Sequence, residues 1–431
     1  MHHNITVDGR TGAGRFVRPA LLCAALFLTP AALSAPAVAQ PMALVPAQGE
    51  LFFRPGNEAA ANELLTLLAT SSADGLDPKR YRMRELPRLV RSARSGNPQA
   101  RARAERALSE AYVRYAQDLR RAPNMGVIYV DGELKPQAPA AATLLAQAAA
   151  APDLARYMRE MGWLHPYYAQ LRRQITDNRL DPAKRGLVQV NMARIRSLPA
   201  SGRYVLVNAA AQRLFMMEGT QAVDMMRVVV GKPVYPTPMM AALIRYTSLR
   251  PYWNVPSDLA AERIVPNVIK GGAPYLKAKG YQVLSDWSDK AKLVSPASVD
   301  WKAVAAGRKE VRLRQLPGPA NSMGDMKFMF PNPQGIYLHD TPQDELFGEA
   351  ARLFSGGCVR LEAAHRLGAW LYGKPLKAKG AAPEQKVPLA QPVPVYLTYL
   401  TVVPSGSELA YYEDIYKRDA PAVARQRLAA R

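Results

Sequence analysis

Cysteine is nearly absent from this sequence. Only Cys23 and Cys358 occur in 431 residues. Cys23 lies in an N-terminal segment that we expect to be removed, and the single thiol then remaining cannot form an internal disulfide. A disulfide-stapled scaffold is therefore excluded. A free thiol in an exported chain is exposed to oxidation, so its presence indicates either a small buried side chain or a thiol with a catalytic function.

Long hydrophobic runs are also missing. The apolar run over residues 20–33 is interrupted by Pro30 and is shorter than the ~20 residues that a membrane span needs. A basic stretch over residues 10–18 precedes it and Ala-Val-Ala at residues 37–39 follows it, which is the form of a secretory signal peptide. We predict a signal peptide over residues 1–39, an exported protein and no stable membrane anchor.

Acidic residues are scarce relative to basic ones. The 57 lysines and arginines against 35 aspartates and glutamates give a net charge of +22, and removal of the signal peptide leaves +20. Such a charge attracts nucleic acid, an anionic membrane or an anionic polymer. The basic residues form no dense tract, and no helix-turn-helix, zinc-finger or RNA-binding signature occurs. We therefore expect no nucleic-acid partner and favour an acidic cell-wall polymer.

Histidine is sparse as well, with five residues in the chain, and no metal motif such as HExxH is present. We expect neither a metal nor an organic cofactor. His165 precedes Pro166 in a predicted turn, and we assign it a structural role. His365 falls opposite the apolar face of a predicted helix over residues 362–372, and we expect it to be solvated.

The remaining residues that could carry chemistry gather in residues 335–360. An apolar, strand-like run ends at His339, and a turn containing Gly356 and Gly357 presents Cys358. A thiolate is the nucleophile of cysteine enzymes, an imidazole helps to form it, and the N–H groups of a glycine turn can hold an oxyanion. The spacing by itself leaves a buried structural cysteine equally open.

Two motifs in this segment resemble the signature of the L,D-transpeptidases of the YkuD type. HDT at residues 339–341 matches the HxT element, and SGGCVR at residues 355–360 matches S-x-G-C-x-R. The resemblance extends over residues 202–419 and is closest to the YcbB-like branch, whose motifs stand here as YWNVP, KFMFPNP, YLHDTP and DIYKRD. Many members of that branch insert a peptidoglycan-binding module after the scaffold, and the chain between residues 171 and 202 is too short for one.

The resemblance implies a role for each motif residue. Cys358 would attack the carbonyl of an L-residue that precedes a D-residue in the peptidoglycan stem, with His339 as general base and then acid. The backbone carbonyl of Asp340 would orient the imidazole, and the N–H groups of Gly357 and Cys358 would hold the oxyanion. The supporting residues would be Ser355, Gly356, Arg360, Tyr337 and Thr341.

The implied product is a crosslink in the periplasmic cell wall, formed when a diaminopimelate amine of a second stem takes the acyl group. Stems contain two L-to-D bonds, so the crosslink is of the 1-3 or the 3-3 type. Members without the wall-binding module are linked to the 1-3 type, which we expect here. The resemblance also implies acylation of the thiol by carbapenems.

Other activities remain open at this stage. Water as the acceptor would give an L,D-carboxypeptidase or endopeptidase, and a protein amine would give an enzyme that attaches proteins to the wall. A non-enzymatic wall-binding scaffold is a further alternative. A papain-like protease is disfavoured, because that class places its cysteine near the mature N-terminus with the histidine downstream.

Hydrophobic periodicity predicts an α+β chain, with an all-helical scaffold domain followed by an antiparallel β-rich catalytic domain. Tyr112 and Tyr115 of the scaffold fall on one face of a predicted helix and are expected to be core. The predicted segments are a linker over residues 40–56, the scaffold over 57–185, the catalytic domain over 202–400 and a tail over 401–431. Within the catalytic domain we expect strands at 204–208, 213–218, 222–230, 244–249, 327–330, 335–339 and 393–402.

The alternating pattern stops between residues 254 and 325, where helical or irregular structure is expected. An insertion of this length is typical of a lid or binding loop, and its position matches the capping subdomain of the family. Most of the aromatic residues in and near this lid are expected to pack within it; they are Tyr252, Trp253, Tyr275, Tyr281, Trp287 and Trp301.

Overall fold

The protein is described here by a computed structural model that covers residues 49–57, 59–178, 180–288 and 290–429. The predicted signal peptide, Cys23 and most of the predicted linker lie outside these residues. Within them, no helix is both long and apolar enough to cross a membrane.

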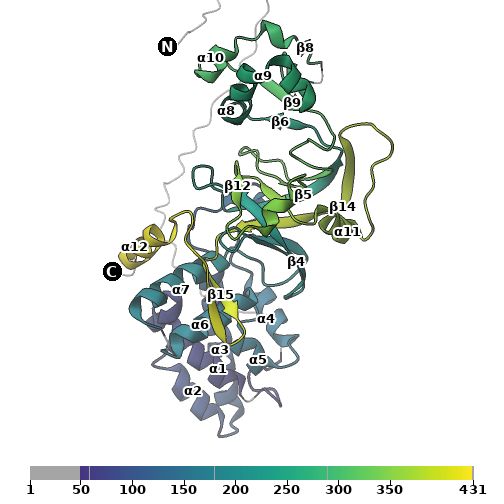
Figure 1. Cartoon of the computed structure of the whole chain (residues 1–431). Coiled ribbons are helices and arrows are strands. Elements are labelled where there is room, and N and C mark those ends of the chain that lie inside the picture. The colour runs from purple at the N-terminus through teal and green to yellow at the C-terminus, as the bar shows by residue number, and fades with distance from the viewer. Residues whose placement is uncertain (1–48, 58, 179, 289, 430–431) are drawn as a thin grey trace, which may run out of the picture. The chain divides into compact units, whose positions relative to one another are not determined.

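The scaffold region is helical, as predicted, and Figure 1 labels its elements. Its helices are α1 (Ala60–Ala69), α2 (Leu86–Ala93), α3 (Pro98–Arg120), α4 (Ala141–Ala149), α5 (Leu154–Arg159), α6 (Pro166–Thr176) and α7 (Pro182–Ile195). Three of them begin at a side-chain cap followed by proline: Asn97 before α3, His165 before α6 and Asp181 before α7. A capping side chain accepts a free backbone N–H, and proline suits the first helical position.

The aromatic residues of the scaffold form its core, as predicted. Tyr112 and Tyr115 of α3 are fully buried, and both meet Trp163 edge to face, with ring centres 5.1 Å and 6.2 Å apart. Beneath them Arg172 and Asp74 form a buried ion pair at 3.0 Å. Hydrogen bonds from tyrosine hydroxyls to Asp74 compensate much of the cost of burying its charge.

The scaffold departs from the prediction at its edges. The end of the predicted linker is packed, because Leu51 and Phe52 are buried and the N–H of Phe52 donates to the Glu105 carboxylate at 2.9 Å. The region also contains β1 (Ile128–Tyr129), which pairs with a strand of the catalytic domain. Helix α7 runs ten residues past the predicted boundary, to Ile195. Helical periodicity could not reveal a two-residue strand whose partner lies over a hundred residues away.

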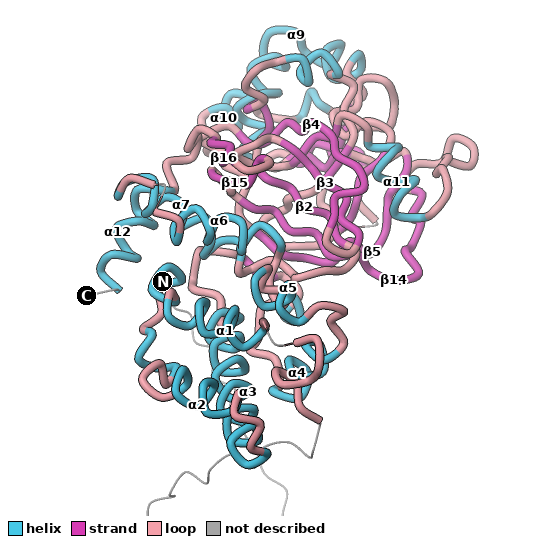
Figure 2. The backbone as a smooth tube through the Cα atoms, turned by 90° about the horizontal axis from the view of Figure 1, so that it is seen from below, coloured by secondary structure: helices cyan, strands magenta, loops and turns pink. Residues whose placement is uncertain are grey.

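The catalytic domain is built on one large sheet. Its strands are β2 (Tyr204–Asn208), β3 (Arg213–Glu218), β4 (Gln221–Gly231), β5 (Met240–Leu249), β10 (Met326–Met329), β11 (Leu338–His339), β12 (Leu353–Ser355), β13 (Val359–Leu361) and β14 (Gln385–Thr398). The order is β1-β5-β10-β11-β13-β4-β3-β2-β14, and β14 also pairs with β5, so the sheet closes on itself. Figure 2 shows these strands gathered together, with α11 (Ala364–Tyr372) beside them.

Most neighbouring strands are antiparallel, as predicted, but four pairs are parallel: β1 with β5, β12 with β4, β14 with β2, and β11 with β13. The β11–β13 pair matters for function because it joins the two predicted motifs side by side. The strand predicted over residues 335–339 is shorter than expected, since only Leu338 and His339 belong to β11.

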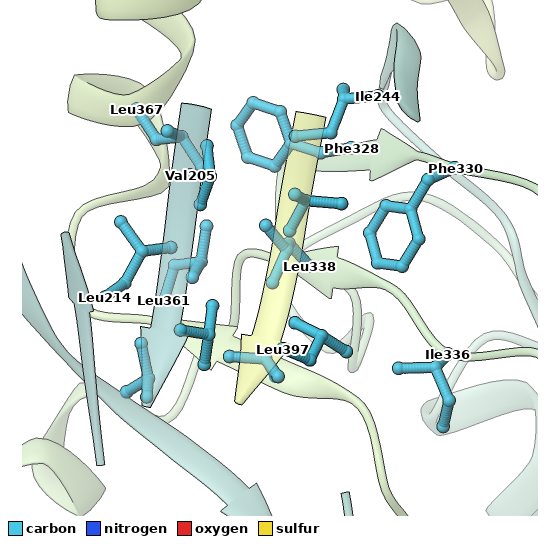
Figure 3. Packing of buried hydrophobic residues seen from close by; sticks show 14 of the residues in the cluster. Val205, Leu214, Ile244, Phe328, Phe330, Ile336, Leu338, Leu361, Leu367 and Leu397 are labelled. Carbon is cyan, nitrogen blue, oxygen red and sulfur yellow. The ribbon is translucent and has the colours of Figure 1, made fainter. Parts of the chain in front are cut away.

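Alternating side chains of the sheet fill its interior. Figure 3 shows Leu214, Ile244, Phe328, Leu338 and Leu397 lying together there, each from a different strand. Leu367 of α11 belongs to the same cluster. Burying one such side chain contributes about 1.5–3 kcal/mol, so the strands that carry the motif residues are held by packing on their opposite side.

The lid contains more β structure than predicted. Besides α8 (Ser257–Leu259), a π-helix (Ala260–Ile264), α9 (Val265–Ala278) and α10 (Trp301–Ala305), it has β6 (Trp253–Val255), β7 (Tyr281–Leu284), β8 (Leu293–Val294) and β9 (Arg312–Gln315). These strands form a separate sheet of order β6-β9-β7-β8. They are short and far apart in sequence, which hides their alternation. The lid has its own core, against which four of the six predicted aromatics pack: Trp253, Tyr275, Tyr281 and Trp301. Trp287 is exposed, and the centre of the Tyr252 ring lies 4.2 Å from the guanidinium carbon of Arg314.

The C-terminal segment is folded and is not a tail. Strands β15 (Val402–Ser405) and β16 (Glu408–Tyr411) form a hairpin, and α12 (Asp419–Ala429) follows. The carboxylate of Asp419 accepts a 2.6 Å bond from buried Arg194 of α7. The segment is therefore tied to the scaffold.

Candidate active site

Three neighbouring strands bring the predicted site residues to one face of the sheet. Lys327 of β10 lies opposite His339 of β11, which in turn lies opposite Arg360 of β13. Side chains two residues apart along a strand share a face, so Tyr337 and Cys358 lie on the same face as this row. The N–H of Val359 donates to the Tyr337 carbonyl at 2.9 Å, which holds the two segments in register.

His339 is buried and oriented by the next residue. Its Nδ1 lies 2.5 Å from the carbonyl oxygen of Asp340 and its side chain is 2% exposed. A carbonyl can only accept, so Nδ1 carries the proton and Nε2 is left as the proton acceptor. Burial, assisted by the charge of Arg360, lowers the pKa of His339 to about 3. The imidazole is therefore neutral at physiological pH.

Cys358 follows the glycine turn and is partly buried. Its Sγ–H donates to the Gly335 carbonyl at 3.6 Å. Burial raises the pKa of the thiol, while the backbone N–H of Tyr337 and the charges of Lys327 and Arg360 oppose the rise. The resting centre thus pairs a neutral thiol with a neutral imidazole and is not a preformed ion pair.

Cys358 directly precedes β13 and lies two residues before Arg360, the residue opposite His339. The thiol and the imidazole therefore share one face of the sheet. The thiol is bonded to Gly335 and not to His339 in this structure, so proton transfer requires a rotation of the thiol side chain toward Nε2. Catalytic hydrogen bonds are often long before substrate binds.

The N–H of Gly357, expected to be an oxyanion donor, already has a partner in this structure. The N–H of Gly357 donates to Ser355 Oγ at 3.1 Å, and the same hydroxyl donates to the Cys358 carbonyl at 2.5 Å. Gly357 N–H is therefore occupied and does not point freely into an oxyanion site. A buried N–H needs a partner, and sequence alone could not show that Ser355 supplies it. The φ of +112° at Gly357 explains why glycine stands there.

Two further motif residues hold the loop after His339. Arg360 Nη1 donates to Gln343 Oε1 at 2.7 Å, and the N–H of Gln343 donates to the buried hydroxyl of Thr341 at 3.3 Å. Arg360 therefore has a structural contact in addition to its charge beside Cys358.

Lys327 is a site residue that the sequence analysis did not single out. Its Nζ lies 3.7 Å from the centre of the Tyr337 ring, and burial lowers its pKa. The signal was present in the sequence: a lysine stands between Met326 and Phe328, which are both buried, so alternation places it on the opposite face. In the sequence analysis, Lys327 appears only as the first residue of the KFMFPNP motif.

The lid touches the turn that presents Cys358. A Cβ added to Gly356 would lie 2.9 Å from a methyl carbon of Leu259. Nearby, the Tyr235 hydroxyl donates to the Glu262 carboxylate at 2.6 Å. The lid segment around α8 and the π-helix thus lies against the turn that presents Cys358.

One group of side chains could hold a metal ion. Ligand atoms of Asp325, Asp340 and His365 lie within 4.8 Å of one another. The Asp340 carboxylate also accepts from the N–H of Asp325 at 2.8 Å. His365 is exposed, as predicted. Since exposed acidic groups are common without an ion, we assign no metal to this group.

Comparison with known proteins agrees with this arrangement. Residues 50–175 match the family described as "Scaffold domain", and residues 202–393 match the "L,D-transpeptidase catalytic domain". A protein of Haemophilus influenzae named "Putative L,D-transpeptidase" is 28% identical over 237 residues, which are 53% of this chain and 47% of that protein. The chain thus spans about half the length of this curated relative. The domain order is consistent with a YcbB-like protein.

Proposed function

We propose, from the premise that residues 202–393 belong to the L,D-transpeptidase catalytic domain family, that this protein crosslinks peptidoglycan through an acyl-enzyme on Cys358. The observation that carries the proposal is the parallel pairing of β11 with β13. It places an oriented, neutral imidazole and a thiol on one face of the sheet, beside a turn that the lid touches.

In the first half of the reaction, His339 Nε2 takes the proton of Cys358 as Sγ bonds to the carbonyl carbon of the L-residue. The tetrahedral intermediate then collapses, the carbon–nitrogen bond to the D-residue breaks, and the imidazolium returns its proton to the leaving amine. A thioester on Cys358 results.

In the second half, the neutral diaminopimelate amine of another stem attacks the thioester carbonyl carbon while His339 Nε2 takes one proton from its nitrogen. The carbon–sulfur bond breaks and the imidazolium returns that proton to Sγ, which restores the thiol and leaves a new amide crosslink. The donor is the bond after residue 1 or after residue 3 of the stem. We propose the 1-3 crosslink as the product and the 3-3 crosslink as its alternative.

The oxyanion must be held by donors that the resting structure leaves available. Because Gly357 N–H is bonded to Ser355, we assign this role to the N–H of Cys358 itself, with Lys327 and Arg360 adding positive charge. One oxyanion donor contributes roughly 3 kcal/mol. Ser355 then acts as a positioning residue that fixes the turn.

The proposed site of action is the periplasm, reached through the signal peptide over residues 1–39. The charge of +20 on the mature chain suits an anionic wall.

The test is incubation of the purified mature protein with defined muropeptides, followed by mass spectrometry. Dimers are expected, and the position of the new amide identifies the crosslink type. Shortened monomers alone would show a carboxypeptidase or endopeptidase instead. Cys358→Ala and His339→Gln should abolish dimers, whereas His365→Gln, an exposed histidine, serves as the matched control.

A second measurement distinguishes the transpeptidase from a wall-binding scaffold that has no catalytic activity. Intact mass after incubation with a carbapenem should rise by one drug molecule, and Cys358→Ala should prevent the adduct. Wall crosslinking unchanged by Cys358→Ala in cells that depend on this protein would favour the scaffold.

A further inference from the structure

A cavity of about 320 Å³ lies between the C-terminal segment, α7 and the segment before β5, and none of the residues that form the Cys358 site lines it. Its volume is at the lower end of the range usual for small-ligand pockets. Helix α12 lies beside α7 (Figure 1), and Ala422 packs against Val190 and Ala193 there. The apolar side chains that line the cavity include Met125, Pro238 and Met239.

The charged part of the cavity wall is positive. Four basic side chains line it, and no described aspartate or glutamate does; they are Arg194, Lys417, Arg418 and Arg425. Among the described residues only Arg194 has an ion-pair partner, Asp419, so three of the four cations are unpaired. Burial lowers the pKa of Arg418, and the charge of Arg194 lowers it further. A cleft lined by charges of one sign concentrates counter-ions, so the cavity favours an anion.

The basic side chains differ in how firmly they are held. The guanidinium carbon of Arg418 lies 4.8 Å from the centre of the Tyr416 ring and 5.0 Å from that of the Tyr399 ring. These cation–π contacts fix its position. Lys417 and Arg425 are exposed. The backbone of Lys417 is left-handed, with φ of +54°, which is uncommon for lysine and recurs at binding sites. Two cations can therefore move onto a ligand beside a fixed third.

The surroundings of the cavity favour carboxylate over phosphate. Phosphate sites commonly use backbone N–H groups at the start of a helix. The N–H groups of Arg418 and Asp419, where α12 begins, already donate to the Asp414 carboxylate at 2.8 Å and 2.9 Å. A carboxylate on a short aliphatic chain instead suits cations beside apolar surface. Peptidoglycan stem peptides carry several such carboxylates.

The cavity is connected to the turn that presents Cys358. Arg418 Nη2 donates to the carbonyl of Thr237 at 3.0 Å, and Thr237 Oγ1 donates to the carbonyl of Gly357 at 2.8 Å. Two hydrogen bonds thus join the cavity wall to the turn. A wall segment bound in the cavity is held near the reacting groups, and such tethering raises the effective concentration of attached substrate.

We propose that this cavity binds the carboxylates of a peptidoglycan stem peptide, at a site separate from the one where a stem acylates Cys358. The inference rests on the proposed function, which supplies the substrate class, and deepens it by adding a second binding site. Lys417 and Arg425 contact the carboxylates, and the methionine side chains contact the aliphatic part. The C-terminal segment thereby holds the wall in a chain too short, between residues 171 and 202, for an inserted wall-binding module.

The test is NMR of methionine methyl groups in the mature protein carrying Cys358→Ala, which cannot form the acyl-enzyme. Met125 and Met239 line the cavity, so their signals, assigned with Met125→Leu and Met239→Leu, report its occupancy. Titration with the stem tetrapeptide should shift both signals, and the same peptide with every carboxylate amidated should shift neither. The signal of Met158, which is fully buried in the scaffold, is the internal control.

A pair of substitutions tests the cations. Lys417→Gln with Arg425→Gln should weaken the peptide affinity read from these signals about tenfold or more, because charge-assisted contacts are lost. Arg103→Gln with Lys135→Gln removes the same charge from exposed scaffold positions and is the matched control. Equal weakening by both pairs would mean unspecific attraction and would overturn the inference. Thermal unfolding of each variant separates misfolding from lost recognition.

Two other outcomes contradict the inference. Unshifted Met125 and Met239 signals at high peptide concentration would show that the cavity does not bind stems. Inorganic phosphate that shifts them at lower concentration than the peptide would assign a phosphate site instead. Dimer formation from muropeptides tests the proposed function separately: dimers without these shifts overturn only the inference, and shifts without dimers overturn only the proposed function.

Discussion

The ammonium of Lys327 stands 3.7 Å from the centre of the Tyr337 ring, with His339 opposite it on the next strand. Its charge opposes the rise in the pKa of Cys358 that burial causes. Lys327→Met should therefore raise the pKa of the thiol further, which the pH dependence of alkylation by iodoacetamide will measure. Lys386→Met is a suitable control, because Lys386 is an exposed lysine on β14. An unshifted alkylation profile would show that Lys327 does not act on the thiol.

Ser355→Ala should destabilise the protein and impair catalysis together. The hydroxyl bonds both the Gly357 N–H and the Cys358 carbonyl, and a buried group left without a partner costs about 1–3 kcal/mol. We expect the free energy of unfolding to fall by about 2 kcal/mol or more and the crosslinking rate to drop. Ser298→Ala, which removes an exposed turn bond, should change stability by less than about 0.5 kcal/mol. Equal stabilities for the two variants would contradict the proposed role of Ser355.

Gly356→Ala should disturb the contact between the lid and the nucleophile turn. The added methyl would meet Leu259 at 2.9 Å, and overpacking of this kind costs about 1–3 kcal/mol. We expect a carbapenem to acylate this variant more slowly, and intact-mass measurements over time give the rate. Leu259→Ala in the same chain should restore part of the rate, because it removes the colliding atoms. If the rate losses of the two substitutions simply add in the double variant, the effect of Gly356→Ala does not come from its contact with Leu259.

Two buried histidines should make the protein sensitive to acid. Burial lowers the pKa values of His165 and His339 to about 3 from an ordinary value of 6.5. Between these pH values the unfolded chain binds a proton at each histidine that the folded chain does not. Stability is therefore fully present above about pH 6.5 and falls as the pH drops toward 3.

His165→Asn should reduce this loss by about 1.4 kcal/mol per pH unit. Asparagine can still cap α6, as His165 does through its bond from the Tyr167 N–H. Denaturant unfolding from pH 8 to pH 4 gives the slope, and the value at pH 8 isolates any loss of packing. An identical slope in both proteins would mean that His165 is protonated in the fold.

The sequence predicted the parts of the protein that depend on local patterns. Short β-type runs bounded by turn residues located β2 and β3 at their observed bounds, and helical spacing identified Tyr112 and Tyr115 as core. The SGGCVR and HDT motifs pointed to residues that the fold places on one face. These features are encoded within a few residues of one another.

Prediction failed where partners are distant in sequence. The lid sheet and β1 contain short strands whose partners lie far along the chain. The C-terminal hairpin is local, but its strands have only four residues each and β15 contains Pro404, so its strand pattern is weak. The hydrogen bond from the Gly357 N–H to Ser355 was not predicted for a related reason. Whether a backbone donor is free depends on the side-chain rotamer of a neighbouring serine, and the motif sequence does not specify that rotamer.

By itself the sequence determined which groups are present: one thiol after the predicted signal peptide, an imidazole, a glycine turn, and an excess of positive charge. The tertiary structure decided their states. Burial makes His339 neutral and keeps Cys358 a thiol, the register across β10, β11 and β13 adds Lys327 to the site, and the lid packs Leu259 against the turn that presents Cys358. Desolvation and neighbouring charge set the protonation of each group, and both arise only when the chain has folded.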